Sequence, residues 1–183
     1  MTQIPGRPAP RPGQHDPASV PGEAGADERW LRQAIGLSRC CPRSDAAFSV
    51  GAVLVSRTGA VIATGFSRER DRSDHAEEVA LAKAAESAGH VQGGDGPLAG
   101  GRLAGATIYS SLEPCLRRAS RPRSCAALIV AAGLRRVVLA WREPPLFVPG
   151  GGAVWLRGRE VTVIEMPELA AEARSVNAHL FPG

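Results

Sequence analysis

Apolar residues occur in short continuous runs and in longer stretches with helical spacing. The run over residues 50–55, Val-Gly-Ala-Val-Leu-Val, is apolar throughout and predicts a buried strand. The Arg-Thr-Gly sequence at 57–59 is typical of a tight turn, and residues 60–66 return as a second strand. The early part of the chain therefore predicts a β-hairpin.

Helices are predicted before and after this hairpin. Residues 28–40 keep apolar side chains at helical spacing, with Asp27 as the N-cap and Pro42 as the stop. Residues 67–73 form a charged loop, after which Asp74 can cap an Ala-rich helix that begins near His75 and ends before residue 89. Residues 89–105 are glycine-rich and predict a surface loop.

Strands and helices alternate in the second half of the chain. Strands are predicted at 106–111, 136–141 and 160–164, and helices at 125–132, 153–157 and 167–180. Pro114 suits the first turn of a further helix, which would place Cys115 at a helix N-terminus. This order predicts an α/β fold, a three-layer α/β/α sandwich around a five-stranded mixed sheet whose last two strands are parallel.

The chain divides into a tail and one domain. Residues 1–26 are rich in Pro, Gly and Ala and cannot bury enough apolar surface to fold alone, so we predict a disordered tail there and a single domain over 27–183. No apolar run approaches the ~20 residues of a membrane span, and the N-terminus lacks a signal pattern. We therefore expect a cytoplasmic protein without a membrane partner.

Four residues carry the chemistry. His75, Cys115 and Cys125 are predicted to hold Zn²⁺, and three protein ligands are the number that leaves a catalytic zinc open to water. Glu77, two residues after His75, is the predicted catalytic acid and base. A His-x-Glu followed by a Pro-Cys is typical of zinc-dependent nucleobase deaminases. The alternative, a closed zinc site with Cys41 as the fourth ligand, leaves Glu77 unexplained.

Charge favours an anionic small-molecule substrate. The net charge is +4, and Lys83 is the only lysine, so nearly all the positive charge is arginine. Arginine forks match the geometry of phosphate, which predicts a phosphorylated substrate. The aromatic content of 4% disfavours nucleic acid, whose single strands stack on aromatic side chains. Two arginine groups flank the predicted ligands: Arg68, Arg70 and Arg72, then Arg117, Arg118, Arg121 and Arg123.

Residues from about Asp27 to Leu180 resemble the cytidine deaminase-like superfamily. The two cysteines are separated by nine residues, a wide gap that resembles the riboflavin-pathway pyrimidine deaminases, and above all the fungal diaminohydroxyphosphoribosylaminopyrimidine deaminases. The stretches that carry the resemblance are 47–52 (Ala-Phe-Ser-Val-Gly-Ala), 65–69 (Gly-Phe-Ser-Arg-Glu), 75–77 (His-Ala-Glu) and 113–115 (Glu-Pro-Cys), with Arg118 and Ser120 before Cys125.

The resemblance implies hydrolysis of the 2-amino group of a ribosyl- or ribitylamino-pyrimidinone 5′-phosphate, in riboflavin biosynthesis or a related specialised pathway. It also implies a homo-oligomer, either a dimer or a tetramer. The chain departs from the fungal pattern at 70–74, where that pattern has Pro-Gly-Asn-Thr, and at Leu116 and Arg121, which replace Ser and Gly. The implied substrate contacts are Phe48, Ser67, Arg68, Glu113, Arg118 and Ser120.

Two other functions are compatible with the sequence. The first is a deaminase of another nucleoside, nucleotide or free base, against which the wide cysteine gap and its arginines argue only weakly. The second is a non-catalytic zinc-stabilised binding protein, for which Glu77 would have no role.

Overall fold

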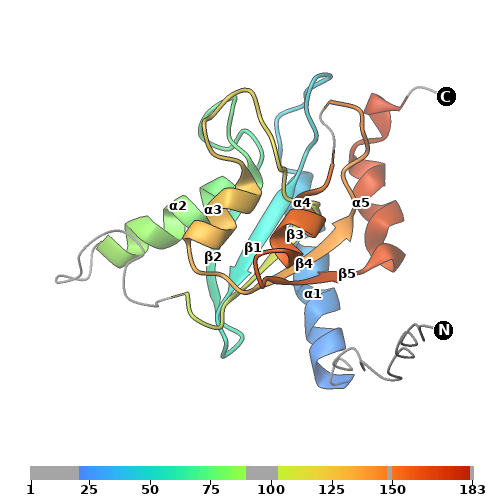
Figure 1. Ribbon diagram of the computed structural model, residues 1–183. Coiled ribbons are helices and arrows are strands. Elements are labelled where there is room, and N and C mark those ends of the chain that lie inside the picture. Colours follow the sequence, from blue (N-terminus) through green and yellow to red (C-terminus); the bar gives the residue numbers. More distant parts are fainter. Residues whose placement is uncertain (1–20, 90–102, 148–149, 182–183) are drawn as a thin grey trace, which may run out of the picture.

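The computed structural model describes residues 21–89, 103–147 and 150–181 (Figure 1). A five-stranded sheet has the order β2-β1-β3-β4-β5. β1 pairs antiparallel with β2 and β3, whereas β3–β4 and β4–β5 are parallel. The predicted mixed sheet is confirmed. The strands are β1 (Gly51–Val55), β2 (Val61–Phe66), β3 (Thr107–Leu112), β4 (Arg136–Trp141) and β5 (Thr162–Glu165).

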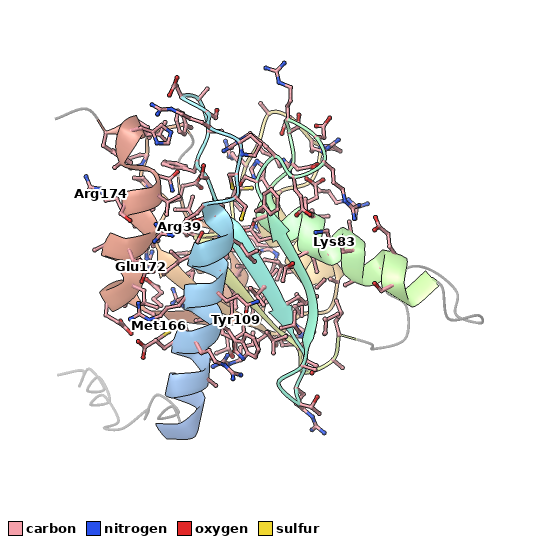
Figure 2. All side chains as sticks on the ribbon, turned by 180° about the vertical axis from the view of Figure 1, so that it is seen from behind. Arg39, Lys83, Tyr109, Met166, Glu172 and Arg174 are labelled. Carbon is pink, nitrogen blue, oxygen red and sulfur yellow. The ribbon has the colours of Figure 1, made fainter. Side chains whose placement is uncertain are left out.

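Helices cover both faces of the sheet. Figures 1 and 2 show α1 and α5 together on one face, and α2, α3 and α4 on the other. Side chains alternate along each strand, so that Val53 of β1 packs in one core with Leu31 of α1, and Leu54 in the other with Leu81 of α2. The predicted three-layer sandwich is confirmed. The helices are α1 (Pro21–Ser38), α2 (Ala76–Gly89), α3 (Cys125–Ala131), α4 (Gly152–Arg157) and α5 (Ala170–Val176), with 3₁₀ turns η1 (Pro167–Leu169) and η2 (Ala178–Leu180).

A glycine in β2 sets the position of α2. A Cβ atom at Gly65 would lie 2.3 Å from the carbonyl oxygen of Ala76 and 2.7 Å from the amide nitrogen of Ala80. Only glycine permits so close an approach of helix and strand. The first turn of α2 therefore rests directly on β2, which fixes the place of His75 and Glu77.

The predicted start of α1 is wrong. The helix begins at Pro21 rather than at residue 28, and Asp27 lies inside it instead of capping it. The buried Asp27 carboxylate accepts hydrogen bonds from Arg136 at 2.6 and 2.9 Å and from the Tyr109 hydroxyl at 2.8 Å. These partners, more than 80 residues away along the chain, decide its role. Residues 21–26 of the predicted disordered tail are thus helical, whereas residues 1–20 lie outside the described ranges, where the tail stays a prediction.

Three further local predictions are corrected: the helix at Pro114, the cap at Asp74 and the continuous last helix. Residues 113–124 contain no helix, so Pro114 does not start one and Cys115 lies in a loop. The Asp74 carboxylate accepts from the backbone amides of Arg70 and Asp71, and thus orders the loop before α2. The last helix, predicted as continuous, is divided into η1, α5 and η2.

The other predicted helices and strands begin and end within about two residues of the observed ones. The predicted loop at 89–105 lies mostly outside the described residues. Among the described helices none is long and apolar enough to span a membrane.

Candidate active site

Three metal-ligating side chains converge where the loops after β2 and β3 meet the start of α3. His75 directly precedes α2, Cys115 lies three residues after β3, and Cys125 is the first residue of α3. The Nδ1 atom of His75 lies 3.5 Å from the Sγ atoms of both cysteines. The three donor atoms all lie within 4.8 Å of one another. One imidazole nitrogen and two sulfurs fit the donor preference and ligand count of a catalytic zinc site.

The start of α3 stabilises negative charge on sulfur. The backbone amide of Cys125 donates to the Sγ atom of Cys115 at 3.4 Å, so this sulfur faces a helix N-terminus although Cys115 itself lies in a loop. The Cys125 thiol and then His75 donate to Cys115, and these bonds outweigh burial and lower the pKa of Cys115. The pKa of Cys125 is raised by the same hydrogen bond and by burial. One thiolate is therefore favoured before any cation binds.

Glu77 lies in the first turn of α2, next to this cluster. Its side chain is buried, and its Oε1 atom accepts a hydrogen bond from the Ser110 hydroxyl of β3 at 2.9 Å. Burial and then the negative charge of Cys115 raise the pKa of Glu77. A carboxyl group whose pKa moves toward neutrality can both accept and return a proton. Ser110 also fixes the direction in which this carboxyl points.

A cavity of about 290 Å³ opens over His75, Glu77 and Cys115. It is concave and mostly apolar, as small-molecule sites usually are. All six predicted substrate contacts line it, so the structure brings them together beside the cluster: Phe48, Ser67, Arg68, Glu113, Arg118 and Ser120.

Most of the polar atoms of these six residues are already bonded to protein. Arg68 donates to the carbonyl oxygens of Pro42 and Phe48 and to the Ser49 hydroxyl, at 2.9 to 3.0 Å. The Ser67 hydroxyl accepts from the Val50 amide. Arg68 and Ser67 therefore shape the wall of the cavity around Phe48.

Glu113 and Arg118 are committed in the same way. The Glu113 carboxylate accepts from the backbone amides of Glu143, Gly151 and Ala153, at 3.1, 3.3 and 2.7 Å, and so holds the loop between β4 and α4. The Arg118 side chain is only 3% exposed and donates to Glu78, to Ser120 and to a backbone carbonyl. The polar atoms of both side chains are therefore already hydrogen-bonded within the protein.

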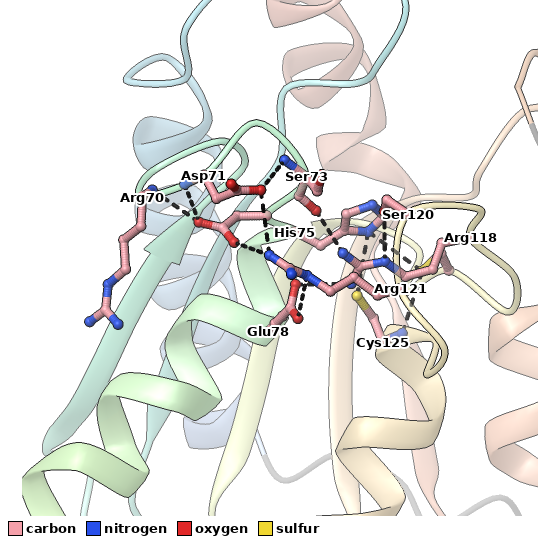
Figure 3. A network of polar contacts seen from close by, with 11 residues as sticks. Arg70, Asp71, Ser73, His75, Glu78, Arg118, Ser120, Arg121 and Cys125 are labelled. Atoms are coloured by element: carbon pink, nitrogen blue, oxygen red, sulfur yellow. Dashed lines mark hydrogen bonds and ion pairs between the residues drawn. The ribbon is translucent and has the colours of Figure 1, made fainter.

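A polar network joins the two loops that supply the ligands (Figure 3). Arg118 donates to Glu78 at 3.0 Å and to the Ser73 carbonyl oxygen at 2.6 Å. Arg121 lies 3.1 Å from Asp74, 3.2 Å from Glu78 and 3.5 Å from Asp71. Residue 121 and residues 70–74 are two of the places where the chain departs from the fungal pattern. The residues at which the chain departs from the fungal pattern therefore form ion pairs with one another.

Arg72, Arg117, Glu143 and Phe147 also line the cavity and were not among the predicted contacts. Arg72 and Arg117 are exposed, and neither has a hydrogen bond or ion pair within the described part of the chain. Both belong to the two arginine groups noted in the sequence. Only the structure shows that Arg68, Arg118 and Arg121 are paired within the protein, whereas Arg72 and Arg117 are not. Glu143 and Phe147 come from the loop after β4, and their position directly after a strand was the available signal.

Cys41 does not join the metal-ligating group. Its thiol donates to the Val50 carbonyl oxygen at 3.3 Å, and burial raises its pKa. The group of candidate metal ligands contains only His75, Cys115 and Cys125 among the described residues. The geometry does not favour the closed four-ligand alternative.

Comparisons with known proteins agree with this site. The family model for the cytidine and deoxycytidylate deaminase zinc-binding region matches residues 25–141. A diaminohydroxyphosphoribosylamino-pyrimidine deaminase of Schizosaccharomyces pombe is 38% identical over 138 residues, which are 75% of this chain and 31% of that protein. An enzyme of the same name from Buchnera aphidicola is 30% identical over 153 residues, 83% of this chain and 91% of its own length.

Solved structures show the same fold. A Thermotoga maritima diaminohydroxyphosphoribosylaminopyrimidine deaminase/reductase superposes with a TM-score of 0.65 at 28% identity, over 84% of this chain and 40% of that one. The Aspergillus oryzae Rib2 deaminase in complex with DARIPP gives a TM-score of 0.62 at 19% identity, over 85% of this chain and 96% of that one, and supports the fold alone.

The chain spans about a third of the length of the first curated relatives that it matches, at 31% and 32%. The match nevertheless includes His75, Glu77 and Cys115 and the loop to Cys125. The zinc cofactor predicted from the sequence is thus supported by the family and by the converging donors. This chain belongs to the cytidine and deoxycytidylate deaminase family, whose characteristic region binds zinc.

Proposed function

We propose that the chain is a zinc-dependent hydrolytic deaminase of a phosphorylated aminopyrimidine. The substrate would be a ribosyl- or ribitylamino-pyrimidinone 5′-phosphate that loses its 2-amino group, as the names of the S. pombe and B. aphidicola relatives suggest. The observation that carries the proposal is the convergence of His75, Cys115 and Cys125 beside the buried Glu77, at one end of a cavity.

His75, Cys115 and Cys125 would hold the zinc, which supplies a water activated for attack near neutral pH. Water enters the reaction and ammonia leaves, so each proton of the water must be moved. Glu77 takes one proton from the attacking water and delivers it to the ring nitrogen beside the amino-bearing carbon. It then carries the second proton to the departing amine, which leaves as ammonia. Its raised pKa suits both directions of transfer.

Apolar side chains form part of the cavity wall. Leu112 and Phe48 line the cavity near the cluster. Phe48 packs edge-to-face on Trp141 and Phe147, with ring centroids 5.5 and 5.0 Å apart. An apolar wall of this kind accepts a flat heterocycle and strengthens the electrostatic contacts inside.

Arg72 and Arg117 are the proposed phosphate contacts. They are exposed on the edge of the cavity, with no protein partner among the described residues, whereas Arg68 and Arg118 are fully engaged. A phosphate placed between them would receive charge-assisted hydrogen bonds. The ring would then occupy the interior of the cavity and the sugar phosphate its edge.

The test is ammonia release by the zinc-loaded protein from a panel of phosphorylated and unphosphorylated pyrimidines and purines. We expect turnover of the phosphorylated diaminopyrimidine and little of its dephosphorylated form. Exclusive turnover of unphosphorylated cytidine would reject the substrate proposal. The absence of turnover on every compound, with stoichiometric zinc present, would favour the non-catalytic zinc-stabilised protein instead.

We also propose that the chain self-assembles into a dimer or tetramer. Val154 on α4 is 63% exposed and lies in the outer layer beside α3, so this surface is a candidate contact. Sedimentation at micromolar concentration tests the proposal, and a monomer under those conditions would reject it.

A further inference from the structure

Two buried side-chain atoms have no hydrogen-bond partner among the described residues. They are the Nε atom of Arg121 and the Oε2 atom of Glu143. Arg121 Nε lies 3.2 Å from a carboxylate oxygen of Glu78 and therefore belongs to an ion pair. Glu143 has no such ion pair among the described residues, so its Oε2 atom is buried without a partner in a residue that is otherwise partly exposed.

Glu113, the other glutamate that follows a central strand and lines the cavity, does have hydrogen-bond partners. Glu113 and Glu143 follow adjacent parallel strands and line the same cavity. Glu113 receives three backbone amides, one of them from Glu143 itself at 3.1 Å. The main chain of Glu143 is thus held in place, while its buried Oε2 atom receives no hydrogen bond from the described residues.

The main chain around Glu143 is closely packed. A Cβ atom at Gly150 would lie 2.9 Å from the Glu143 carbonyl oxygen, so the two ends of the loop pack against each other. The neighbouring Arg142 is bound to Glu165 at 2.7 Å and offers no compensating charge. Burial, and then the negative charges of Cys115, Glu113 and Glu77, raise the pKa of Glu143 to about 8.

A buried polar group without a partner costs stability, and native proteins retain few of them. A group of this kind that lines a ligand cavity finds its partner in the ligand. Whether the carboxyl is ionised or protonated, it keeps an oxygen that can accept from an N–H or O–H group of the ligand. An aminopyrimidine with a sugar substituent offers both, on its amino groups and on its hydroxyls.

We propose that Glu143 is a specificity-determining residue that hydrogen-bonds an N–H or O–H donor of the substrate, and this inference rests on the proposed deaminase function. The side chain selects donor-rich heterocycles and rejects analogues that would leave its carboxyl unpaired. Its role differs from that of Glu77, because Glu143 positions the substrate and Glu77 moves protons.

Glu143→Ala and Glu143→Gln test the inference, with Glu168→Gln as the matched control on an exposed site outside the cavity. We expect kcat/KM to fall about 10- to 100-fold for Glu143→Ala, mostly through KM, and less for Glu143→Gln, which keeps one acceptor oxygen. Zinc content should be unchanged. The melting temperature of the ligand-free protein should rise, since the uncompensated carboxyl is gone, whereas the shift induced by the reaction product should shrink.

Two substrates distinguish the sources of the donor. If the loss in kcat/KM is the same on the phosphoribosyl compound and on the sugar-free aminopyrimidine, Glu143 contacts the ring. If the loss disappears on the sugar-free compound, Glu143 contacts a sugar hydroxyl. Either result supports the inference.

The inference fails if an active wild type loses no more than twofold in kcat/KM in both Glu143 variants. It also fails if these variants melt at a lower temperature than wild type and lose zinc, because Glu143 would then be a structural residue. A zinc-loaded wild type that releases ammonia from no aminopyrimidine would remove the proposed function together with this inference.

Discussion

The metal-ligating residues and the neighbouring arginines use their polar atoms in opposite ways. His75, Cys115 and Cys125 turn their donor atoms toward one another, within 4.8 Å. Elsewhere, Arg118 of the cavity wall and Arg121 of the adjoining loop turn toward carboxylates and a carbonyl of the protein. The donor atoms of His75, Cys115 and Cys125 can bind a metal ion between them, whereas Arg118 and Arg121 are already bound to protein groups. A charged side chain near a site is therefore not necessarily a ligand contact. Its hydrogen bonds and ion pairs within the protein determine whether it is available to a ligand.

The comparison also explains the departures from the fungal pattern. Arg121 and the acidic residues 71 and 74 form ion pairs with each other, so the substitutions compensate within the protein. Among the described arginines that line the cavity, Arg72 and Arg117 are then those without a hydrogen bond or ion pair. The four predictions below test this division, in order of decreasing effect.

Removing a metal ligand should have the largest effect. Cys125→Ala should abolish both stoichiometric zinc and ammonia release, because two remaining ligands cannot hold a catalytic ion. Elemental analysis and the deaminase assay measure this. The control is Cys40→Ala, which changes an exposed cysteine and should leave both quantities as in wild type. Retention of zinc in Cys125→Ala would contradict the proposed ligand set.

Glu77→Gln should separate chemistry from metal binding. We expect kcat to fall about 10²- to 10⁴-fold, the range for losing a general acid and base, while the zinc content stays at one ion per chain. The hydrogen bond from Ser110 can still be accepted by the amide oxygen, so the fold should persist. Turnover within about tenfold of wild type would show that another group moves the protons.

Removal of both unpaired arginines should weaken substrate binding without affecting the chemistry. The double variant Arg72→Gln/Arg117→Gln should raise KM for the phosphorylated substrate about 10- to 100-fold, with kcat nearly constant. The dephosphorylated substrate should show no change. Arg135→Gln is the control, since this exposed arginine precedes β4 at the opposite end of the sheet from the cavity. An equal rise in KM for both substrates would argue against phosphate contacts.

Arg121→Gln should give the smallest effect. Its ion pairs are partly exposed and worth little individually, so we expect the melting temperature to fall by about 1–3 °C. KM should stay within twofold of wild type, because the guanidinium already faces protein carboxylates. A rise in KM as large as that of the double variant would erase the distinction between paired and unpaired arginines.

The sequence predicts the strands and the zinc ligands well because both depend on local pattern. Apolar runs such as that in β4 identify a buried strand, and the His-x-Glu and Pro-Cys motifs carry their spacing with them. The roles of Asp27 and Glu113 were not predictable in this way. Asp27 pairs with Arg136, 109 positions away, and Glu113 binds amides 30 to 40 positions away.

The same reasoning applies to the arginines near the cavity. Their sequence neighbours do not distinguish Arg117 from Arg118, yet one is exposed and the other is 3% exposed against Glu78. Sequence spacing gives the neighbourhood of a side chain, and only tertiary contacts give its partners. The six predicted substrate contacts accordingly line the right cavity, but most serve to build its wall.

The network of Arg118 and Arg121 has a consequence for how the enzyme acquires its ion. The network joins the loop before α2 and the first turn of α2 to the loop before α3, through arginine side chains that contact carboxylates and the Ser73 carbonyl oxygen. His75 and Cys125 are therefore brought together by arginine–carboxylate contacts that need no cation. We expect the apoprotein to keep a preassembled coordination sphere, so that chelation and reloading proceed reversibly, without unfolding of the polypeptide.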